Sequence, residues 1–158
     1  MKNAMKQLHI LIVTTFGAGF SPIAPGTAGA IVGCVFLWAF NQFQIFPFYP
    51  NPGLFIGLII VVALIGIYAT NQLEREWGKD PSKVVIDELV GVWIAMIFVP
   101  FTWLNLFLAF GLFRFFDILK PLGIRKMENF KGGIGVMADD VLAGIYANLV
   151  LQLILYFL

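Results

Sequence analysis

The sequence predicts an all-α integral membrane protein, organised as a single domain over residues 1–158, and three observations predict it. First, the chain is 60% hydrophobic and only 12% charged, whereas a soluble domain has roughly 25% charged residues. Second, its apolar residues form uncharged runs that are long enough to cross a bilayer as helices. Third, all basic residues fall on one side of an arrangement of about five such helices, as expected for cytoplasmic loops.

The composition also argues against several other classes of protein. A net charge of +1 points to no nucleic-acid partner. Cys34 is the only cysteine and lies in an apolar run, so neither a disulfide framework nor a cysteine metal site is expected. Lys2 and Lys6 precede a short apolar stretch at residues 8–13, but no convincing cleavage site follows, and we expect no signal peptide.

Two spans are expected in the first half of the chain. Residues 28–40 are apolar and extend towards Phe48, where three prolines break the run. Residues 53–70 form an uncharged run of 18 residues, which is long enough for the second span. Residues 9–20 are too short to cross and are rich in Gly and Thr, so we expect this segment to be interfacial or re-entrant.

The middle of the chain allows two topologies. Residues 89–113 are uncharged and fit either one long tilted helix or two shorter helices that turn near Pro100. One helix would place five Lys and Arg on each side of the membrane, whereas two helices would place all ten on one side. Because cytoplasmic loops carry an excess of Lys and Arg, the sequence favours two spans, at residues 84–99 and 104–119. With a last span at residues 141–158, the N-terminus lies in the cytoplasm and the C-terminus outside.

These two middle spans are short, at 16 residues each. That length is about 24 Å of helix, whereas the hydrocarbon core is about 30 Å thick. We therefore expect Asp87, Glu88, Arg114 and Asp117 at or slightly below the level of the headgroups. Charges at that depth are costly unless they are paired, bound to metal or hydrated.

Four motifs cluster on the predicted cytoplasmic side, and the first is SPIAPGTAG at residues 21–29. Gly26 and Thr27 lead into a helix N-terminus, where free N–H groups bind anions and the Thr27 hydroxyl adds a donor. Taken alone, the motif is better explained as an ordinary helix entry, with Gly29 and Gly33 as a packing face.

The second motif is VVIDELVG at residues 84–91. Asp87 and Glu88 are expected in the first turns of the third span, where carboxylates are ordinary partners of the helix dipole. A simple cap does not explain why an apolar span follows these carboxylates immediately.

The third motif is FRFFDILKP at residues 113–121. Arg114, Asp117 and Lys120 are spaced i, i+3 and i+6, so they share one helical face. The pattern fits a salt-bridged helix end with a snorkelling Lys120. It fits equally well an Arg fork that binds phosphate beside a metal-binding carboxylate.

The fourth motif is GGIGVMADDVLAG at residues 132–144. We expect Asp139 to cap the last helix and Asp140 to lie in its first turn. Neighbouring helical side chains diverge by about 100°, so one carboxylate can cap while the other points into the bundle. The glycines before them allow the backbone to approach a ligand closely.

Together the motifs predict a metal and phosphate site. Carboxylates from three helices would be neutralised most simply by a divalent cation, and oxygen ligands favour Mg²⁺. The predicted metal ligands are Asp87, Glu88, Asp117, Asp139 and Asp140. Arg114 and Lys120, with the Gly-Thr loop at Thr27, suit a phosphate ester. His9 is the only histidine and no P-loop motif is present, which argues against histidine-based catalysis, zinc and ATP binding.

The four motifs, in this order, resemble those of the phosphatidylglycerophosphatase A family. The resemblance runs from residue 21 to 144 and covers most of the chain. It implies a bacterial inner-membrane phosphatase with its active site on the cytoplasmic side, which hydrolyses phosphatidylglycerophosphate to phosphatidylglycerol with Mg²⁺. The family usually has a second proline shortly after Lys120 and Pro121, where this chain has Gly123, and this difference loosens the loop.

Within this interpretation, Asp87, Glu88, Asp117 and Asp140 are the catalytic carboxylates, while Thr27, Arg114 and Lys120 bind the substrate. Either water attacks the phosphate directly or a carboxylate such as Asp140 first forms an acyl-phosphate. Two other functions remain open. A cation or proton transporter also uses intramembrane acids, although Asn148 and Gln152 in the outer half more often join helices. A lipid alcohol phosphotransferase uses clustered aspartates, but its D-G-x-x-A-R spacing is absent.

Overall fold

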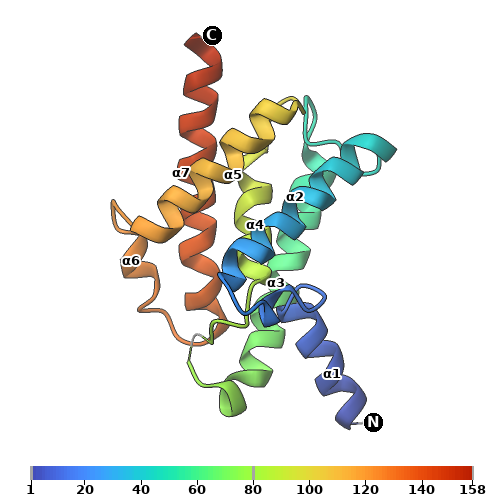
Figure 1. Cartoon of the computed structure of the whole chain (residues 1–158), viewed down its shortest axis with the longest axis vertical. Coiled ribbons are helices and arrows are strands. Elements are labelled where there is room, and N and C mark those ends of the chain that lie inside the picture. Colours follow the sequence, from blue (N-terminus) through green and yellow to red (C-terminus); the bar gives the residue numbers. More distant parts are fainter. Residues whose placement is uncertain (1, 80, 158) are drawn as a thin grey trace.

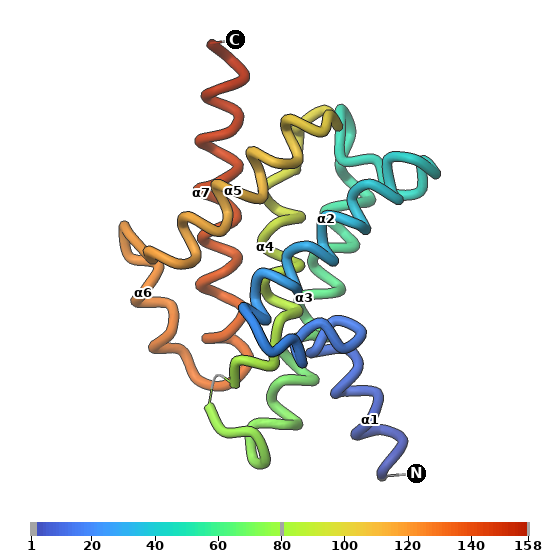
Figure 2. The backbone as a smooth tube through the Cα atoms, in the orientation of Figure 1, coloured from blue at the N-terminus to red at the C-terminus, as the bar shows by residue number. Residues whose placement is uncertain are grey.

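The computed structural model describes residues 2–79 and 81–157, which form seven α-helices, one 3-10 helix and no strand. The all-α prediction is therefore confirmed. In chain order the elements are α1 (Lys2–Val13), the 3-10 helix η1 (Ala18–Phe20), α2 (Pro25–Phe43), α3 (Gly53–Trp77), α4 (Ile86–Ala95), α5 (Trp103–Leu119), α6 (Ile124–Met127) and α7 (Gly133–Phe157). Figure 1 shows that α1 begins and α7 ends at opposite ends of the molecule, and Figure 2 traces the chain between them.

Three of these helices are long and apolar enough to cross a membrane. They are α2 with 19 residues and α3 and α7 with 25 residues each, and they fall on the first, second and last predicted spans. Three apolar helices of this length are typical of a membrane protein. The last of them begins eight residues before the predicted span, at Gly133, and Leu158, the predicted end of that span, lies outside the described residues.

The middle region forms two helices rather than one, as predicted, but the first is shorter than expected. α5 has 17 residues, or about 25 Å of helix. α4 has only 10 residues, or about 15 Å, so the prediction of a 16-residue third span is wrong. The chain turns after Ala95 because Phe98 adopts a φ of 60° and donates its N–H to the carbonyl of Phe48 at 2.9 Å.

The short helix α4 is the centre of the bundle. All of its residues except Glu88 are buried, because α7, α2, α3 and α5 all pack against it, as Figure 1 shows. Its apolar residues therefore contact protein rather than lipid. The indole N–H of Trp93 donates to the carbonyl of Gly33 at 3.0 Å, which fixes α4 against α2.

A side chain from α7 completes the hydrogen bonds at the C-terminal end of α4. The last carbonyls of a helix have no partner within the helix, and the amide of Asn148 donates to Ala95 O at 3.0 Å and Ile97 O at 2.7 Å. Gln152 in turn donates to Asn148 Oδ1 at 2.6 Å. The prediction that Asn148 and Gln152 join helices is thus confirmed for Asn148. Gln152 bonds to Asn148 within the same helix.

The N-terminal segment is divided differently from the prediction. Residues 9–13 end helix α1, which packs along α3, and Lys6 pairs with Glu76 of α3 at 2.6 Å. Thr15 and Phe16 then adopt φ values of 48° and 58°, which turn the chain into η1. Residues 9–20 thus belong to two elements rather than one.

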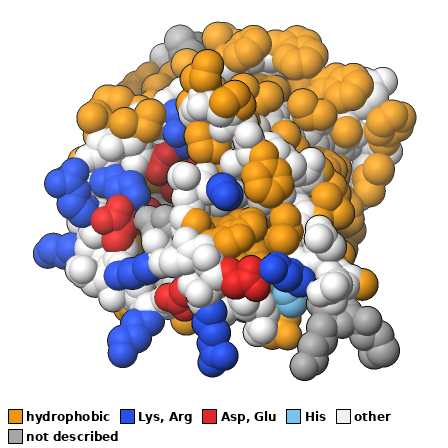
Figure 3. Space-filling view, turned by 60° about the horizontal axis from the view of Figure 1, so that its bottom comes forward, with side chains coloured by type: hydrophobic (Ala, Val, Ile, Leu, Met, Phe, Trp, Pro, Cys, Tyr) orange, Lys and Arg blue, Asp and Glu red, His pale blue; other side chains and the backbone are white. Residues whose placement is uncertain are grey.

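Charged and apolar side chains are separated on the surface. Figure 3 shows Lys, Arg, Asp and Glu gathered towards the end of the molecule from which α1 projects, whereas most of the remaining visible surface is hydrophobic. Large apolar side chains such as Leu64 and Phe107 are more than half exposed. This separation is typical of a protein whose charged end lies in water and whose apolar belt lies in lipid.

The contact between Asn148 and α4 leads to a stability prediction. Replacing Asn148 by Ala leaves two carbonyls at the end of α4 without a donor, which costs about 1–3 kcal/mol. We expect Asn148→Ala to lower the melting temperature of the purified protein in detergent, measured by tryptophan fluorescence. Asn129→Ala, at an exposed turn position, is the matched control, and equal melting temperatures for the two variants would contradict the capping role of Asn148.

Candidate functional site

A cavity of about 260 Å³ lies where the first turns of α2 and α4, the end of α5 and the second turn of α7 come together. Seven of the eight residues predicted from the sequence line this cavity: Asp87, Glu88, Arg114, Asp117, Lys120, Asp139 and Asp140. The eighth, Thr27, is not among the lining residues, although its neighbour Gly26 is. The structure thus brings together residues of all four motifs, with Ala24, Pro25 and Gly26 from the first.

The first turn of α4 supplies two of the carboxylates. The backbone N–H of Val85 donates to the carbonyl of Val13 at 2.8 Å, which ties the start of α4 to the end of α1. Asp87 and Glu88 follow in the first turn, as predicted. No side chain caps this helix, and both carboxylates lie in its first turn. They are therefore beside the positive end of the helix dipole.

The start of α7 is set by α3. Gly133 donates its N–H to Asn71 Oδ1 on α3 at 2.7 Å, and a side chain at Gly133 would meet the carbonyl of Ile67 at 2.5 Å. Whereas a side chain on Gly135 would collide with the carbonyl of Phe130, Gly133 thus allows α7 to approach α3. Because the helix begins at this contact, Asp139 and Asp140 lie in its second turn, and the prediction that they occupy the cap and first turn is wrong.

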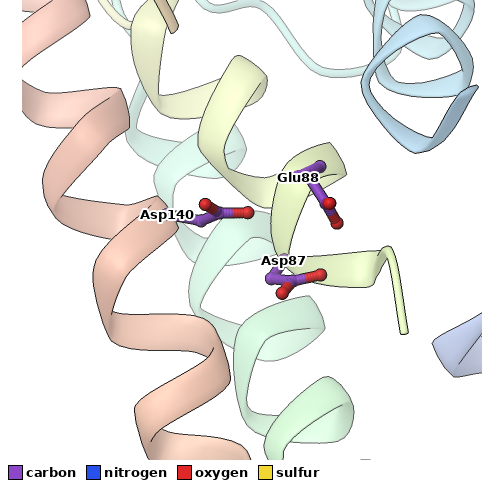
Figure 4. A group of neighbouring side chains, drawn as sticks. All are labelled: Asp87, Glu88 and Asp140. Carbon is purple, nitrogen blue, oxygen red and sulfur yellow. The ribbon is translucent and has the colours of Figure 1, made fainter. Parts of the chain in front are cut away.

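Asp87, Glu88 and Asp140 form the tightest part of the site. One carboxylate oxygen from each residue lies within 4.8 Å of the others. Figure 4 shows Asp140 reaching from α7 towards the start of α4, which carries the other two. Such a separation allows all three side chains to bind one ion, and three oxygen ligands from protein suit a hard cation such as Mg²⁺.

The other two carboxylates are each paired with a basic residue. Arg114 Nη1 donates to Asp117 Oδ2 at 2.5 Å, as the i, i+3 spacing predicted. Lys120 ends α5 in a left-handed conformation, with φ of 47°, and its ammonium donates to Asp139 Oδ2 at 2.5 Å and Glu128 Oε1 at 2.7 Å. Burial lowers the pKa of Lys120, but these hydrogen bonds raise it more, so the net pKa lies above its usual range and Lys120 remains charged.

These ion pairs leave a charge imbalance in the cavity. Five carboxylates face two basic side chains, and both basic side chains contact the carboxylates outside the tight group. Among the five carboxylates of the cavity, Asp87, Glu88 and Asp140 are therefore the three without an ion pair to a described residue. Buried charges of one sign are costly unless a counter-charge is present, and a divalent cation supplies one.

Polar atoms without partners also gather at this cavity. The buried atoms Asp87 Oδ1, Glu88 Oε2, Asp139 Oδ1 and Arg114 Nε have no hydrogen-bond partner among the described residues. More than about 90% of buried polar groups in proteins have one. Three orphaned acceptors and one orphaned donor in one cavity fit a ligand that contains both a cation and an anion. The donor set thus fits the predicted Mg²⁺.

Gly26 and Ser82 also line the cavity, and we did not predict either as a site residue. A side chain on Gly26 would collide with Glu88 Oε1 and come within 3.3 Å of Arg114 Nη1. The Gly26-Thr27 pair led us to predict a site residue here. Gly26 rather than Thr27 lines the cavity beside the carboxylates. Ser82 follows Pro81 in the loop before α4, where the sequence carries no comparable signal.

Gly123 shapes the loop that follows Lys120. Gly123 has a φ of 89°, whereas the proline ring holds φ near −65°. A proline at this position is therefore incompatible with the observed backbone. The loop leads into α6 and brings Glu128 back to Lys120.

The chain is similar to known lipid phosphatases over most of its length. The profile of the family described as Phosphatidylglycerophosphatase A matches residues 11–155. A Haemophilus influenzae protein named "Phosphatidylglycerophosphatase A" is 38% identical over 99% of this chain and 93% of its own length. The protein of that name from Escherichia coli K12 is 34% identical over 92% of this chain and 82% of its own length.

A further relative carries a different name. A Bacteroides thetaiotaomicron protein named "Putative phosphatidylinositol-3-phosphatase" is 53% identical over 89% of each chain. No solved structure matches this chain at a significant level.

The close approach of Gly26 to Glu88 leads to a metal-binding prediction. An added methyl group must displace the Glu88 carboxylate, and changes that misplace a ligand typically weaken metal binding about 10–100-fold. We expect Gly26→Ala to weaken Mg²⁺ or Mn²⁺ binding by at least about tenfold, measured by isothermal titration calorimetry. Gly111→Ala is the matched control, because a side chain there meets nothing within 4 Å; equal affinities would show that Glu88 is not a ligand.

Proposed function

Because the chain belongs to the phosphatidylglycerophosphatase A family, we propose that it hydrolyses the terminal phosphate monoester of phosphatidylglycerophosphate with Mg²⁺, releasing phosphatidylglycerol and inorganic phosphate. The observation that carries the proposal is the shared cavity. Three carboxylates without ion pairs lie beside Arg114, whose Nε is buried and has no partner among the described residues. Such a cavity accepts a dianionic phosphate together with its metal ion.

Arg114 is the main phosphate ligand in this proposal. Its Nη1 is held by Asp117, which fixes the plane of the guanidinium and leaves the Nε side of the fork for a second acceptor. Arginine binds phosphate through two parallel N–H groups. Asp117 therefore acts by orienting Arg114 towards the phosphate.

Lys120 supplies the second positive charge. It is tied to Asp139 and Glu128, so it lies at one wall of the cavity as a fixed charge. As the ester P–O bond breaks, negative charge moves onto the leaving oxygen and the phosphoryl oxygens, and fixed cations stabilise that charge. The first turn of α2, with Gly26 beside Glu88 and Arg114 and Thr27 after it, adds backbone N–H groups that can bind the phosphate.

Asp87, Glu88 and Asp140 are the residues that would hold Mg²⁺. When bound there, the ion would polarise the phosphate and lower the pKa of a water molecule. The carboxylates of the site also offer an acceptor for the proton that the attacking water loses. In an alternative route, Asp140 attacks the phosphorus and the ester P–O bond breaks, so that the lipid alcohol leaves and takes up a proton. Water then hydrolyses the acyl-phosphate and releases inorganic phosphate.

Phosphatidylinositol 3-phosphate is a second candidate substrate, and the name of the 53% identical Bacteroides protein favours it. Both lipids carry a phosphate monoester on a headgroup alcohol, and both keep two acyl chains in the membrane. The charged groups described here would bind the phosphate of either lipid. Discrimination would depend on the headgroup alcohol that also has to fit the cavity.

The transporter alternative has no support. None of the three relatives is named as a transporter. In the half of the molecule away from the site, Asn105 donates to the carbonyl of Pro100 at 2.9 Å, and Asn148 bonds the end of α4. These polar groups join structural elements and do not form an open path.

We place the protein in the bacterial inner membrane, with all five apolar helices embedded and the site on the cytoplasmic side. All ten Lys and Arg residues fall on the predicted cytoplasmic side and none on the other, which supports this orientation. The short central helix α4 then lies within the bundle, where surrounding helices shield it from lipid. Phosphate released from the site would leave on the side where the charged loops lie.

The activity prediction uses the purified protein and both lipids. We expect phosphate release from phosphatidylglycerophosphate that requires Mg²⁺ and stops when EDTA removes it. Asp140→Asn removes one ligand charge with little change in size, and we expect it to lower turnover at least about hundredfold, or about 3 kcal/mol. Glu76→Gln is the control, because Glu76 is an exposed carboxylate paired with Lys6.

Three outcomes of this assay decide between the candidates. Faster release from phosphatidylinositol 3-phosphate than from phosphatidylglycerophosphate would replace the proposed substrate with the second one. Full activity in EDTA would remove the metal from the mechanism. Wild-type turnover by Asp140→Asn would show that the carboxylate cluster is only structural.

The orientation prediction uses single cysteines in a Cys34→Ala background. Gln42 and Lys126 are both exposed and lie at positions expected on opposite sides of the membrane. In intact cells, a membrane-impermeant maleimide should label Gln42→Cys, whereas Lys126→Cys should react only after the membrane is permeabilised. External labelling of Lys126→Cys would overturn the proposed orientation.

A further inference from the structure

A second, wholly apolar groove of about 390 Å³ lies between α2 and α5. Its α2 side is formed by Ile31, Cys34, Val35 and Trp38, and its α5 side by Trp103, Leu106, Phe107 and Phe110. On each helix these positions follow i, i+3, i+4 and i+7, so each set forms one continuous stripe. Neither stripe carries a motif from which the sequence predicts a function.

The groove is continuous with the phosphate site along both helices. On α5, Arg114 follows Phe110 by four residues and Asp117 follows by seven, so both lie on the same stripe. On α2, Ile31 follows Gly26 by five residues, or about 7 Å along the axis. The two helices run antiparallel beside each other in Figure 1. One end of the groove thus points at the cavity that holds Arg114 and Glu88.

The groove remains open because its two helices pack mainly on other partners. α2 packs chiefly on α4, and α5 chiefly on α7, so their facing surfaces are left partly uncovered. Val35 is 56% exposed and Phe107 is 68% exposed. Leu106 forms the buried floor at 4% exposure. The result is a concave apolar surface at the side of the bundle.

We propose that this groove binds an acyl chain of the phospholipid substrate, an inference that rests on the proposed function. A lipid whose phosphate reaches Arg114 has its glycerol backbone at the mouth of the cavity, where α2 and α5 separate. The chain that leaves this point enters the space between the two helices. A flexible chain follows a concave surface closely, and van der Waals packing is what drives association within a membrane.

The groove then has a role in positioning as well as in affinity. Holding the chain along α2 and α5 fixes the distance from the glycerol backbone to the phosphate, and small misplacements of a reacting group cost large factors in rate. The groove contains no charged residue, so it offers nothing to the headgroup. It selects a substrate that carries a long apolar chain beside its phosphate.

The direct test is photo-crosslinking in nanodiscs with lipids that carry a diazirine in one acyl chain. Phosphatidylglycerophosphate labelled in this way should modify residues 31–38 and 103–110 more strongly than phosphatidylcholine with the same label, as mapped by mass spectrometry. Val35→Trp fills the groove and should abolish this excess. Leu64→Trp, at an exposed position of α3 outside the groove, should retain it.

Kinetics supply a second readout on the same variants. We expect Val35→Trp to raise the KM for the long-chain lipid roughly tenfold and to leave hydrolysis of the deacylated headgroup at the level of the wild-type protein. Leu64→Trp should match the wild-type protein on both substrates. A uniform loss on both substrates would indicate a disturbed active site and would overturn the groove proposal.

Failure of the groove and failure of the proposed function give different results. Equal labelling of the groove by both lipids, with phosphate release intact, overturns the groove alone. Dimers joined by a bifunctional maleimide through Cys34, which lines the groove, would assign the groove to a second copy of the chain and also overturn it. Absence of phosphate release by the wild-type protein overturns the proposed function, on which the groove depends.

Discussion

The close approach of α4 and α7 at two glycines is the constraint on which the rest of the structure depends. A side chain on Gly144 would meet the carbonyl of Gly91 at 2.5 Å, and a side chain on Gly91 would lie 3.0 Å from the carbonyl of Asp140. Small residues allow membrane helices to pack this closely. One turn before Gly144 on α7, the carboxylate of Asp140 then faces the first turn of α4. A wider spacing of the two helices would separate Asp140 from Asp87 and remove the common point at which one ion can bind.

The electrostatic design of the site follows from that spacing. Packing acids from two helices together creates repulsion, and the fold offsets part of it with ion pairs from α5 and its end. Arg114 pairs with Asp117, and Lys120 pairs with Asp139. Two of the five acids are therefore paired, and the other three form the unpaired trio Asp87, Glu88 and Asp140. The paired groups hold the basic side chains in place, and the unpaired trio retains the negative charge that attracts a cation. A more complete neutralisation would make a more stable bundle with a weaker metal site.

Local patterns in the sequence predicted some of these features because they depend only on neighbouring residues. The i, i+3 spacing of Arg114 and Asp117 predicted their contact, and the position of Asp87 and Glu88 at the start of an apolar run predicted their place in a first turn. The start of α7 could not be predicted this way, since Asn71, which lies 62 residues away in the chain, fixes it. Lys120 also differs from its predicted place on the helical face, because the helix ends before it and its partners, Glu128 and Asp139, follow in later elements. Long-range contacts decided both cases, and no single-sequence pattern reports them.

The burial of α4, in which every residue except Glu88 is buried, also has a consequence for how the protein is made. A ribosome releases α4 before α5 and α7, and domains assemble as their parts emerge. Until α7 is synthesised, the face of α4 that carries Gly91 has no partner, and Ala95 lacks the donor from Asn148. The innermost helix of the bundle therefore completes its contacts last, when the C-terminal helix arrives. A chain truncated before residue 133 would contain all of α4 but none of α7. The face of α4 that packs on α7 would then be uncovered, and Asp87 and Glu88 would lie beside it. Quality-control proteases can recognise such a partly folded state.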